Sequence, residues 1–133
     1  MVLERIGIAV SDIEASLTHF EALFGASPYK TEEVASEGVR TYFFDAGGTK
    51  IELLESLSED SPVARFLEKR GPGLHHLAFR SEDVEGDFQR LKNAGYRVLG
   101  EGPKEGADGK HIFFVHPGDM QGVLTEFCMT VPR

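Results

Sequence analysis

Three side chains that can bind a cation or carry a proton stand inside apolar, strand-like segments: Glu52, His76 and Glu126. Carboxylate oxygens and imidazole nitrogens ligate several divalent metals, and the same groups act as general acids and bases. Burying a charged carboxylate inside a sheet costs roughly several kcal/mol of folding free energy unless the carboxylate is paired or bound to a cation. Because neighbouring residues of a strand point to opposite faces, each glutamate could equally be an ordinary outward-facing residue.

An internal repeat places these residues in equivalent positions. The apolar segment around Arg5 aligns with the segment around His76, and the segment around Glu52 aligns with that around Glu126. The two alignments differ slightly in offset, as expected when loops differ in length between repeats. His75 and His76 are adjacent, so only one of them can face a common site, and the repeat selects His76. The sequence therefore favours a site at which these positions converge.

Hydrophobic periodicity and turn residues predict the elements that must position the site. Apolar runs bounded by turn residues predict eight strands, at 3–10, 29–34, 38–45, 50–55, 74–80, 96–100, 110–116 and 123–129. Apolar residues at helical spacing predict helices at 13–24 and 84–92. Ser11 and Asp12 are candidate N-caps of the first helix, which Gly25 ends, and Ser81, Glu82 and Asp83 open the second. Pro62 opens a third helix, which Gly71 ends.

These elements form two βαβββ modules, at about 3–55 and about 74–129, joined by a linker helix at about 58–71. The length of 133 residues fits one domain spanning 1–133. The predicted fold class is α+β, with two tandem βαβββ modules that form a curved mixed sheet around a cleft. Such an arrangement can bury one face of the sheet and leave the other for a site.

Composition excludes several classes of function. The net charge of −8 disfavours binding to nucleic acid or to an anionic membrane surface. Cys128 is the single cysteine, so an intramolecular disulfide and a cysteine-rich zinc site are both excluded. Because no apolar run is long enough to span a membrane, the cytoplasm is the expected location.

Six stretches of the chain carry a resemblance to a known family: 5–10, 48–55, 60–71, 73–79, 116–117 and 122–127. They resemble the methylmalonyl-CoA epimerases, a branch of the vicinal-oxygen-chelate superfamily of glyoxalases, bleomycin resistance proteins and dioxygenases. The similarity runs from about Leu3 to Met129. The linker helix and the His75-His76 strand are fairly specific for the epimerase branch, whereas the repeat by itself indicates only the superfamily.

The resemblance implies a metal-dependent isomerase that inverts C2 of methylmalonyl-CoA or of a close 2-substituted acyl-CoA. The family holds a divalent metal ion (cobalt, manganese, zinc or nickel) at four positions, which correspond here to Arg5, Glu52, His76 and Glu126. Three of these are metal-ligand types, so Glu52, His76 and Glu126 are the expected metal ligands. The family is commonly dimeric, which implies a homodimer.

Arg5 departs from the family pattern, which has a histidine at this position. An arginine stays protonated and has no lone pair to donate to a metal. Three interpretations follow from the residue type. Three protein ligands and water could keep the metal; the guanidinium could replace the metal and neutralise Glu52 or Glu126; or Arg5 could bind a substrate carboxylate through two hydrogen bonds.

The proton carriers are a second departure. Some members of the family carry a glutamate two residues after a Gly-Val pair, and Thr41 stands there in this chain. Threonine cannot act as a base at neutral pH, so the candidate catalytic residues are Glu126 and Glu52, with Glu37 in the preceding loop as a weaker candidate. A lysine that the family carries after His-Pro is Gly118 here, which removes one expected contact to a substrate phosphate.

A coenzyme A ester is strongly anionic, so local cations must offset the negative charge of the protein. The candidates are Arg65, Lys69, Arg70, Lys104 and Lys110. Two alternatives to an epimerase are a glyoxalase-like lyase and a metal-free or differently liganded small-molecule binding protein of the bleomycin-resistance type. The His75-His76 strand and the linker helix argue against the lyase, whereas Arg5 and Thr41 favour the binding protein.

Overall fold

The computed structural model describes residues 1–131. Its helices are α1 (Ile13–Phe24), α2 (Pro62–Arg70) and α3 (Val84–Asn93). Its strands are β1 (Val2–Val10), β2 (Lys30–Val34), β3 (Val39–Ala46), β4 (Thr49–Ser56), β5 (Gly73–Arg80), β6 (Lys104–Glu105), β7 (Lys110–Val115) and β8 (Leu124–Thr130). In the described part of the chain no helix is long and apolar enough to cross a membrane.

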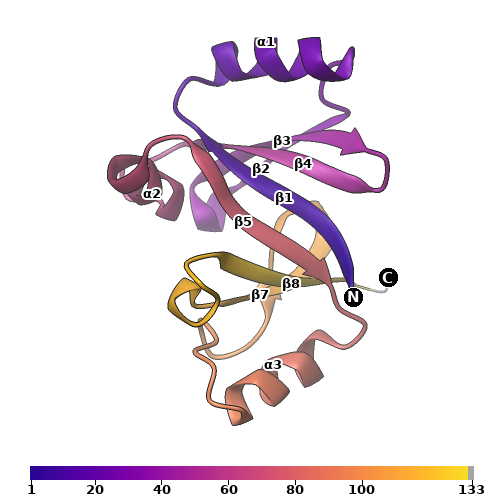
Figure 1. Cartoon of the computed structure of the whole chain (residues 1–133), viewed down its shortest axis with the longest axis vertical. Helices are drawn as coiled ribbons and strands as arrows, with labels where there is room; N and C mark the ends of the chain where they lie inside the picture. The colour runs from indigo at the N-terminus through magenta and orange to yellow at the C-terminus, as the bar shows by residue number, and fades with distance from the viewer. Residues whose placement is uncertain (132–133) are drawn as a thin grey trace. The chain divides into compact units, whose positions relative to one another are not determined.

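The order βαβββ occurs twice, with α2 between the two copies (Figure 1). Strands β5 and β8 pair in parallel, whereas β2 with β3, β3 with β4, and β7 with β8 pair antiparallel. The predicted α+β fold of two βαβββ modules with a mixed sheet is therefore confirmed. The ends of the predicted helices and of most strands agree with the structure to within a few residues.

The chain divides into two compact units, each described here by itself. The first-module unit is Ile6–His75, and its strands lie in the order β2-β3-β4-β1. The second-module unit combines Met1–Arg5 with the chain from His76 onward, and its order is β1-β5-β8-β7-β6. The first residues of β1, including Arg5, thus belong to the sheet that carries His76 and Glu126.

Helix α1 lies along one face of the first-module sheet (Figure 1). Asp12 caps its N-terminus by accepting a hydrogen bond from the Ala15 amide, and Gly25 ends it in the left-handed conformation. On the sheet side, the α1 residue Phe24 stacks on Phe44 at a ring-centroid distance of 5.1 Å. Because strand residues alternate, the residues next to Phe44 point to the opposite face.

Glu52 lies on the sheet face opposite α1. Its cross-strand partner is Phe43, whereas Leu53 packs in the α1 cluster with Phe44. Side chains directly opposite each other in an antiparallel pair share a face, so Phe43 and Glu52 point the same way. Thr41 is two residues from Phe43 on β3 and shares that face.

Helix α3 covers one face of the second-module sheet in the same manner (Figure 1). The α3 residue Phe88 contacts Phe113 edge-on, and Phe113 stacks on Phe127 at 5.0 Å. Asp83 caps α3 by accepting a hydrogen bond from the Gly86 amide. Since Phe127 faces α3, its neighbour Glu126 lies on the sheet face away from that helix.

The predicted strand at 96–100 is wrong. In the structure this segment makes only an isolated bridge, between Val98 and Val115. The Leu99 amide donates to the Phe114 carbonyl at 2.8 Å, and beyond it Gly100 takes a positive φ of 81° that turns the chain away. The edge strand of this module is instead the short β6, which lies between the segments predicted as strands at 96–100 and 110–116.

We expect Cys128 to be unreactive in the folded protein. Its side chain is 1% exposed, and burial raises the pKa of the thiol above its ordinary value, with the Glu126 charge acting in the same direction and Arg5 against it. Because the thiolate is the reactive form, labelling by a disulfide reagent at pH 8 should be at least about 100-fold slower than in urea-unfolded protein. Equal rates in the two states would show that the β8 environment is open to solvent.

Candidate functional site

A buried cluster of polar side chains lies in the second-module unit and consists of Arg5, His76 and Glu126. Arg5 Nη2 donates to Glu126 Oε2 and forms an ion pair with it. His76 Nε2 lies 3.6 Å from the other oxygen of the same carboxylate, Oε1. The three residues are 2%, 5% and 2% exposed, respectively, so this Arg5–His76–Glu126 cluster is shielded from water.

Strand register brings the cluster together. On β8, Glu126 is opposite Ala78 of β5 and Phe114 of β7. The Phe114 ring meets the His76 ring edge-on at 6.2 Å, which forms an apolar wall beside the cluster. His75, one residue earlier, contacts Phe66 instead. His76, which the repeat selects, is therefore the histidine of the pair that lies beside Glu126.

Glu52 is 2% exposed and lies in the first-module unit, on the face described above. The alternative that Glu52 and Glu126 are outward-facing surface residues is therefore wrong for both. Thr41 is also buried, and its hydroxyl donates to the Glu32 carbonyl at 3.1 Å, which ties it to the neighbouring strand. Glu37 is partly exposed in the short 3-10 helix Ala35–Glu37.

The residues of the Arg5–His76–Glu126 cluster do not fit a divalent metal. Among residues 1–131 no group of three or more His, Cys, Asp or Glu side chains is placed to hold a metal ion. The carboxylate of Glu126, one of the expected ligands, already accepts the guanidinium of Arg5. A second cation on that carboxylate would face the fixed positive charge of Arg5, which cannot be removed by loss of a proton.

A second buried ion-pair group was missed by the sequence analysis. Glu4 is 4% exposed and accepts hydrogen bonds from Arg80 Nε at 3.0 Å and Nη2 at 2.7 Å. Lys110 Nζ lies 3.3 Å from the same carboxylate and donates to Thr130 Oγ1 at 2.7 Å. Lys110, a candidate cation for offsetting the negative charge of the protein toward a coenzyme A ester, thus pairs with Glu4 instead. No local pattern marks Glu4, because its partners are far away in the sequence.

The other cations that could offset the negative charge of the protein lie at the surface. Arg65 Nη1 donates to the Asp60 carbonyl at 2.7 Å, the Arg70 guanidinium lies 5.7 Å from the Phe66 ring, and Lys69 is exposed. Lys104 Nζ lies 5.9 Å above the ring of Phe114, the residue that flanks His76. Lys104 is therefore the candidate that shares a neighbour with the cluster.

A cation lies beside Gly118, the position at which the family carries a lysine. Arg97 Nη2 is bound to Asp119 Oδ1 at 2.9 Å, and a Cβ added at Gly118 would lie 2.5 Å from that nitrogen. Hydrogen bonds from Arg97 hold the pKa of the Asp119 carboxyl below its usual value. A positive charge is thus kept next to position 118 although the lysine itself is absent.

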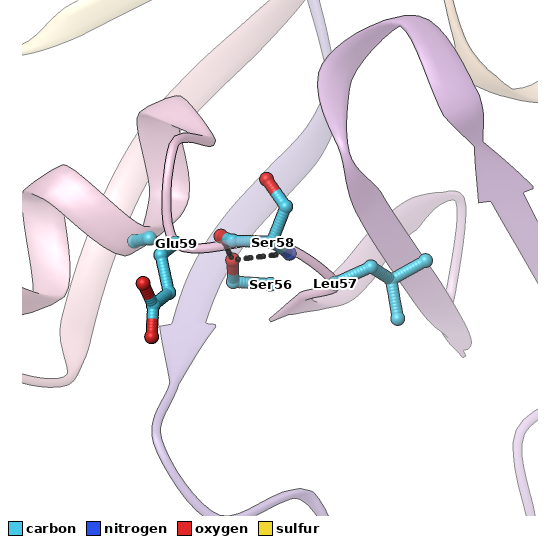
Figure 2. A pocket seen from close by; sticks show the side chains of 5 residues that line it. Ser56, Leu57, Ser58 and Glu59 are labelled. Atoms are coloured by element: carbon cyan, nitrogen blue, oxygen red, sulfur yellow. Dashed lines mark hydrogen bonds between the residues drawn. The ribbon is translucent and has the colours of Figure 1, made fainter.

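A pocket of about 350 Å³ lies at the N-terminal end of α2 (Figure 2). Its lining residues are Ser56, Leu57, Ser58, Glu59 and Ala64. Ser56 Oγ donates to the Ser58 carbonyl and lies 2.6 Å from Ser61 Oγ, which in turn accepts from the Ala64 amide as the helix N-cap. The hydroxyls of Ser56 and Ser61 thus hydrogen-bond to each other and to the backbone at the start of α2.

Residues 4–114 match the Glyoxalase/Bleomycin resistance protein/Dioxygenase superfamily. The chain is 44% identical over 126 residues to an ethylmalonyl-CoA/methylmalonyl-CoA epimerase of Cereibacter sphaeroides, covering 93% of this chain and 94% of that protein.

Two solved structures have the same fold. The methylmalonyl-CoA epimerase of Mycobacterium tuberculosis aligns with a TM-score of 0.92 at 32% identity, over 98% of this chain and 89% of that one. A methylmalonyl-CoA epimerase in complex with methylmalonyl-CoA and NH4+ aligns with a TM-score of 0.89 at 37% identity, over 98% and 94% of the two chains.

Proposed function

Because this chain belongs to the glyoxalase/bleomycin resistance protein/dioxygenase superfamily and, within it, to the methylmalonyl-CoA epimerases, we propose that it is an isomerase that inverts C2 of methylmalonyl-CoA or of a close 2-substituted acyl-CoA. The superfamily hosts several reactions, so membership alone would not select one. The observation that carries the proposal is the near full-length similarity to an epimerase, at 44% identity over 93% of this chain.

The chemistry requires a base, an acid and a nearby positive charge. The C2 proton of the substrate lies between a thioester carbonyl and a carboxylate. A base removes it, the electron pair of the C–H bond forms the enolate, and the thioester oxygen takes the negative charge. Return of a proton to the opposite face of C2 gives the epimer.

Glu126 and Glu52 are the proposed proton carriers, with Glu37 as a third candidate. Both Glu126 and Glu52 are buried carboxylates, which supports a role beyond solubility. His76 lies beside Glu126 and is an imidazole of the kind most often used for proton transfer. Thr41 has no group that could replace the glutamate of the family at this position.

Members of the superfamily typically use a divalent metal ion. The sequence predicts Glu52, His76 and Glu126 as its ligands, and those assignments stay predictions. The ion pair between Arg5 and Glu126 argues against metal binding at Glu126, so no step is assigned to a metal here. One structure with the same fold is a methylmalonyl-CoA epimerase in complex with methylmalonyl-CoA and NH4+. A cytoplasmic location and a homodimer are further proposals, carried over from the resemblance.

The proposal predicts that the protein exchanges the C2 proton of methylmalonyl-CoA. In deuterium oxide, a single C2 epimer should gain deuterium and lose optical purity faster than in a protein-free control, because base removal and return of the proton occur in the site. Proton NMR and chiral analysis measure the two rates. Absence of exchange both in EDTA and with added Co²⁺, together with saturable binding of the ester, would reject the epimerase and favour the small-molecule binding protein.

A further inference from the structure

We infer that the guanidinium of Arg5 takes the place of the divalent metal in this chain, so that the proposed epimerisation proceeds without a metal ion. The inference rests on the proposed function for its chemistry. Its structural part, that Arg5 excludes a divalent metal from Glu126, stands on the geometry of the second-module unit alone.

The position of Arg5 is the first argument. Arg5 aligns with His76 in the repeat, and in the structure it reaches the carboxylate of Glu126, to which His76 also lies close. A permanent cation therefore sits in the same polar cluster as a histidine and a glutamate that are both metal-ligand types. The guanidinium of Arg5 supplies a permanent positive charge at this position, beside the carboxylate of Glu126.

Burial is the second argument. The side chains of Arg5 and Glu126 are each 3% exposed. A charged pair that is shielded from water is screened little, and separating it leaves an uncompensated buried charge. A metal ion could bind Glu126 in two ways only. It could displace the guanidinium of Arg5 from the carboxylate, or it could bind with the guanidinium still beside it; the first leaves a buried unpaired charge and the second brings two positive charges together, so both cost free energy.

The chemistry of the guanidinium is the third argument. Arginine is planar, permanently charged and carries five N–H donors, so it can hold an oxyanion by charge and hydrogen bonding together. In the proposed step a carboxylate takes the C2 proton, the C–H electron pair moves into the C1–C2 bond, and the charge on the thioester oxygen is stabilised by Arg5. Reprotonation of C2 on the other face restores the carbonyl, and the step needs no oxidant or reductant.

The test compares wild type with Arg5→His, which restores an imidazole at the position where the family has one. Calorimetric titration with Co²⁺ should show no saturable binding to the EDTA-dialysed wild-type chain. Arg5→His should bind Co²⁺ saturably, with an affinity at least about 100-fold above the weakest that the titration detects. Wild-type C2 exchange should be the same within about twofold in EDTA and in Co²⁺, whereas exchange by Arg5→His should depend on Co²⁺.

Arg80→His is the matched control, because Arg80 also pairs with a buried glutamate, Glu4, in the same unit. It should not create a Co²⁺ site. Thermal melting of both variants checks that they fold. If Arg5→His does not fold, the Co²⁺ titration of the wild-type chain still tests the inference.

The outcomes separate the two levels of the argument. Wild-type exchange that is abolished by EDTA and restored by Co²⁺ would overturn the inference and leave the epimerase proposal standing. Exchange that is absent in every condition would reject the proposed function. Saturable Co²⁺ binding to wild type would by itself overturn the exclusion of metal by Arg5.

Discussion

Replacing Glu126 with glutamine is expected to lower the free energy of unfolding by about 3–5 kcal/mol, because it leaves Arg5 as a buried charge without its ion-pair partner. Urea denaturation of Glu126→Gln beside wild type measures the loss. The same substitution should also reduce C2 exchange, since Glu126 is a proposed proton carrier.

Glu33→Gln is the matched control for this stability loss. Glu33 also pairs with an arginine, Arg40, but its side chain is 57% exposed, so the control should lose less than about 1 kcal/mol. Adding Arg5→Met to Glu126→Gln should recover more than half of the loss, because the buried charge is then gone. A loss below about 1 kcal/mol for Glu126→Gln itself would mean that the Arg5–Glu126 pair is open to water in solution.

Glu52→Gln is expected to slow C2 exchange by about 10²–10⁴-fold, the usual contribution of a general acid or base. Glutamine keeps the shape of the side chain and cannot take up a proton at neutral pH. Exchange rates at saturating methylmalonyl-CoA, with thermal melting to check folding, measure the effect.

Glu55→Gln controls for the loss of a carboxylate on the same strand. Glu55 lies on the other face of β4, where its side chain accepts a hydrogen bond from the Tyr42 hydroxyl at 2.8 Å. Its exchange rate should stay within about threefold of wild type. A rate for Glu52→Gln in that same range would remove Glu52 from the proton carriers.

The fold was predictable wherever local signals agreed with tertiary packing. Asp12 and Gly25 bound α1 as the capping pattern predicts, whereas alternation along β4 and β8 left open which face Glu52 and Glu126 occupy. The segment 96–100 has strand-forming residues, yet only Val98 forms a bridge. Residue preference does not reveal that the backbone turns away at Gly100.

Part of the candidate site was predictable from the internal repeat. The repeat relates positions in sequence, so it could select His76 and point to Arg5 as the residue out of pattern. It could not decide among three interpretations of Arg5, because the choice depends on which carboxylate the guanidinium reaches. The pairing of Glu4 with Arg80 and Lys110 was invisible for the same reason, since long-range ion pairs leave no local pattern.

Arg5 and Glu126 are separated by 121 positions along the chain, and this distance bears on how the protein folds. Closing so long a loop carries an entropic cost that only subsequent contacts offset, and contacts of this kind slow the approach to the native state. Helices such as α1 can form from neighbouring residues, whereas the ion pair must wait until both ends of the polypeptide have met. The charges of Arg5 and Glu126 are therefore among the last groups to lose their water during folding. A substitution that destabilises this ion pair should speed unfolding more than it slows refolding.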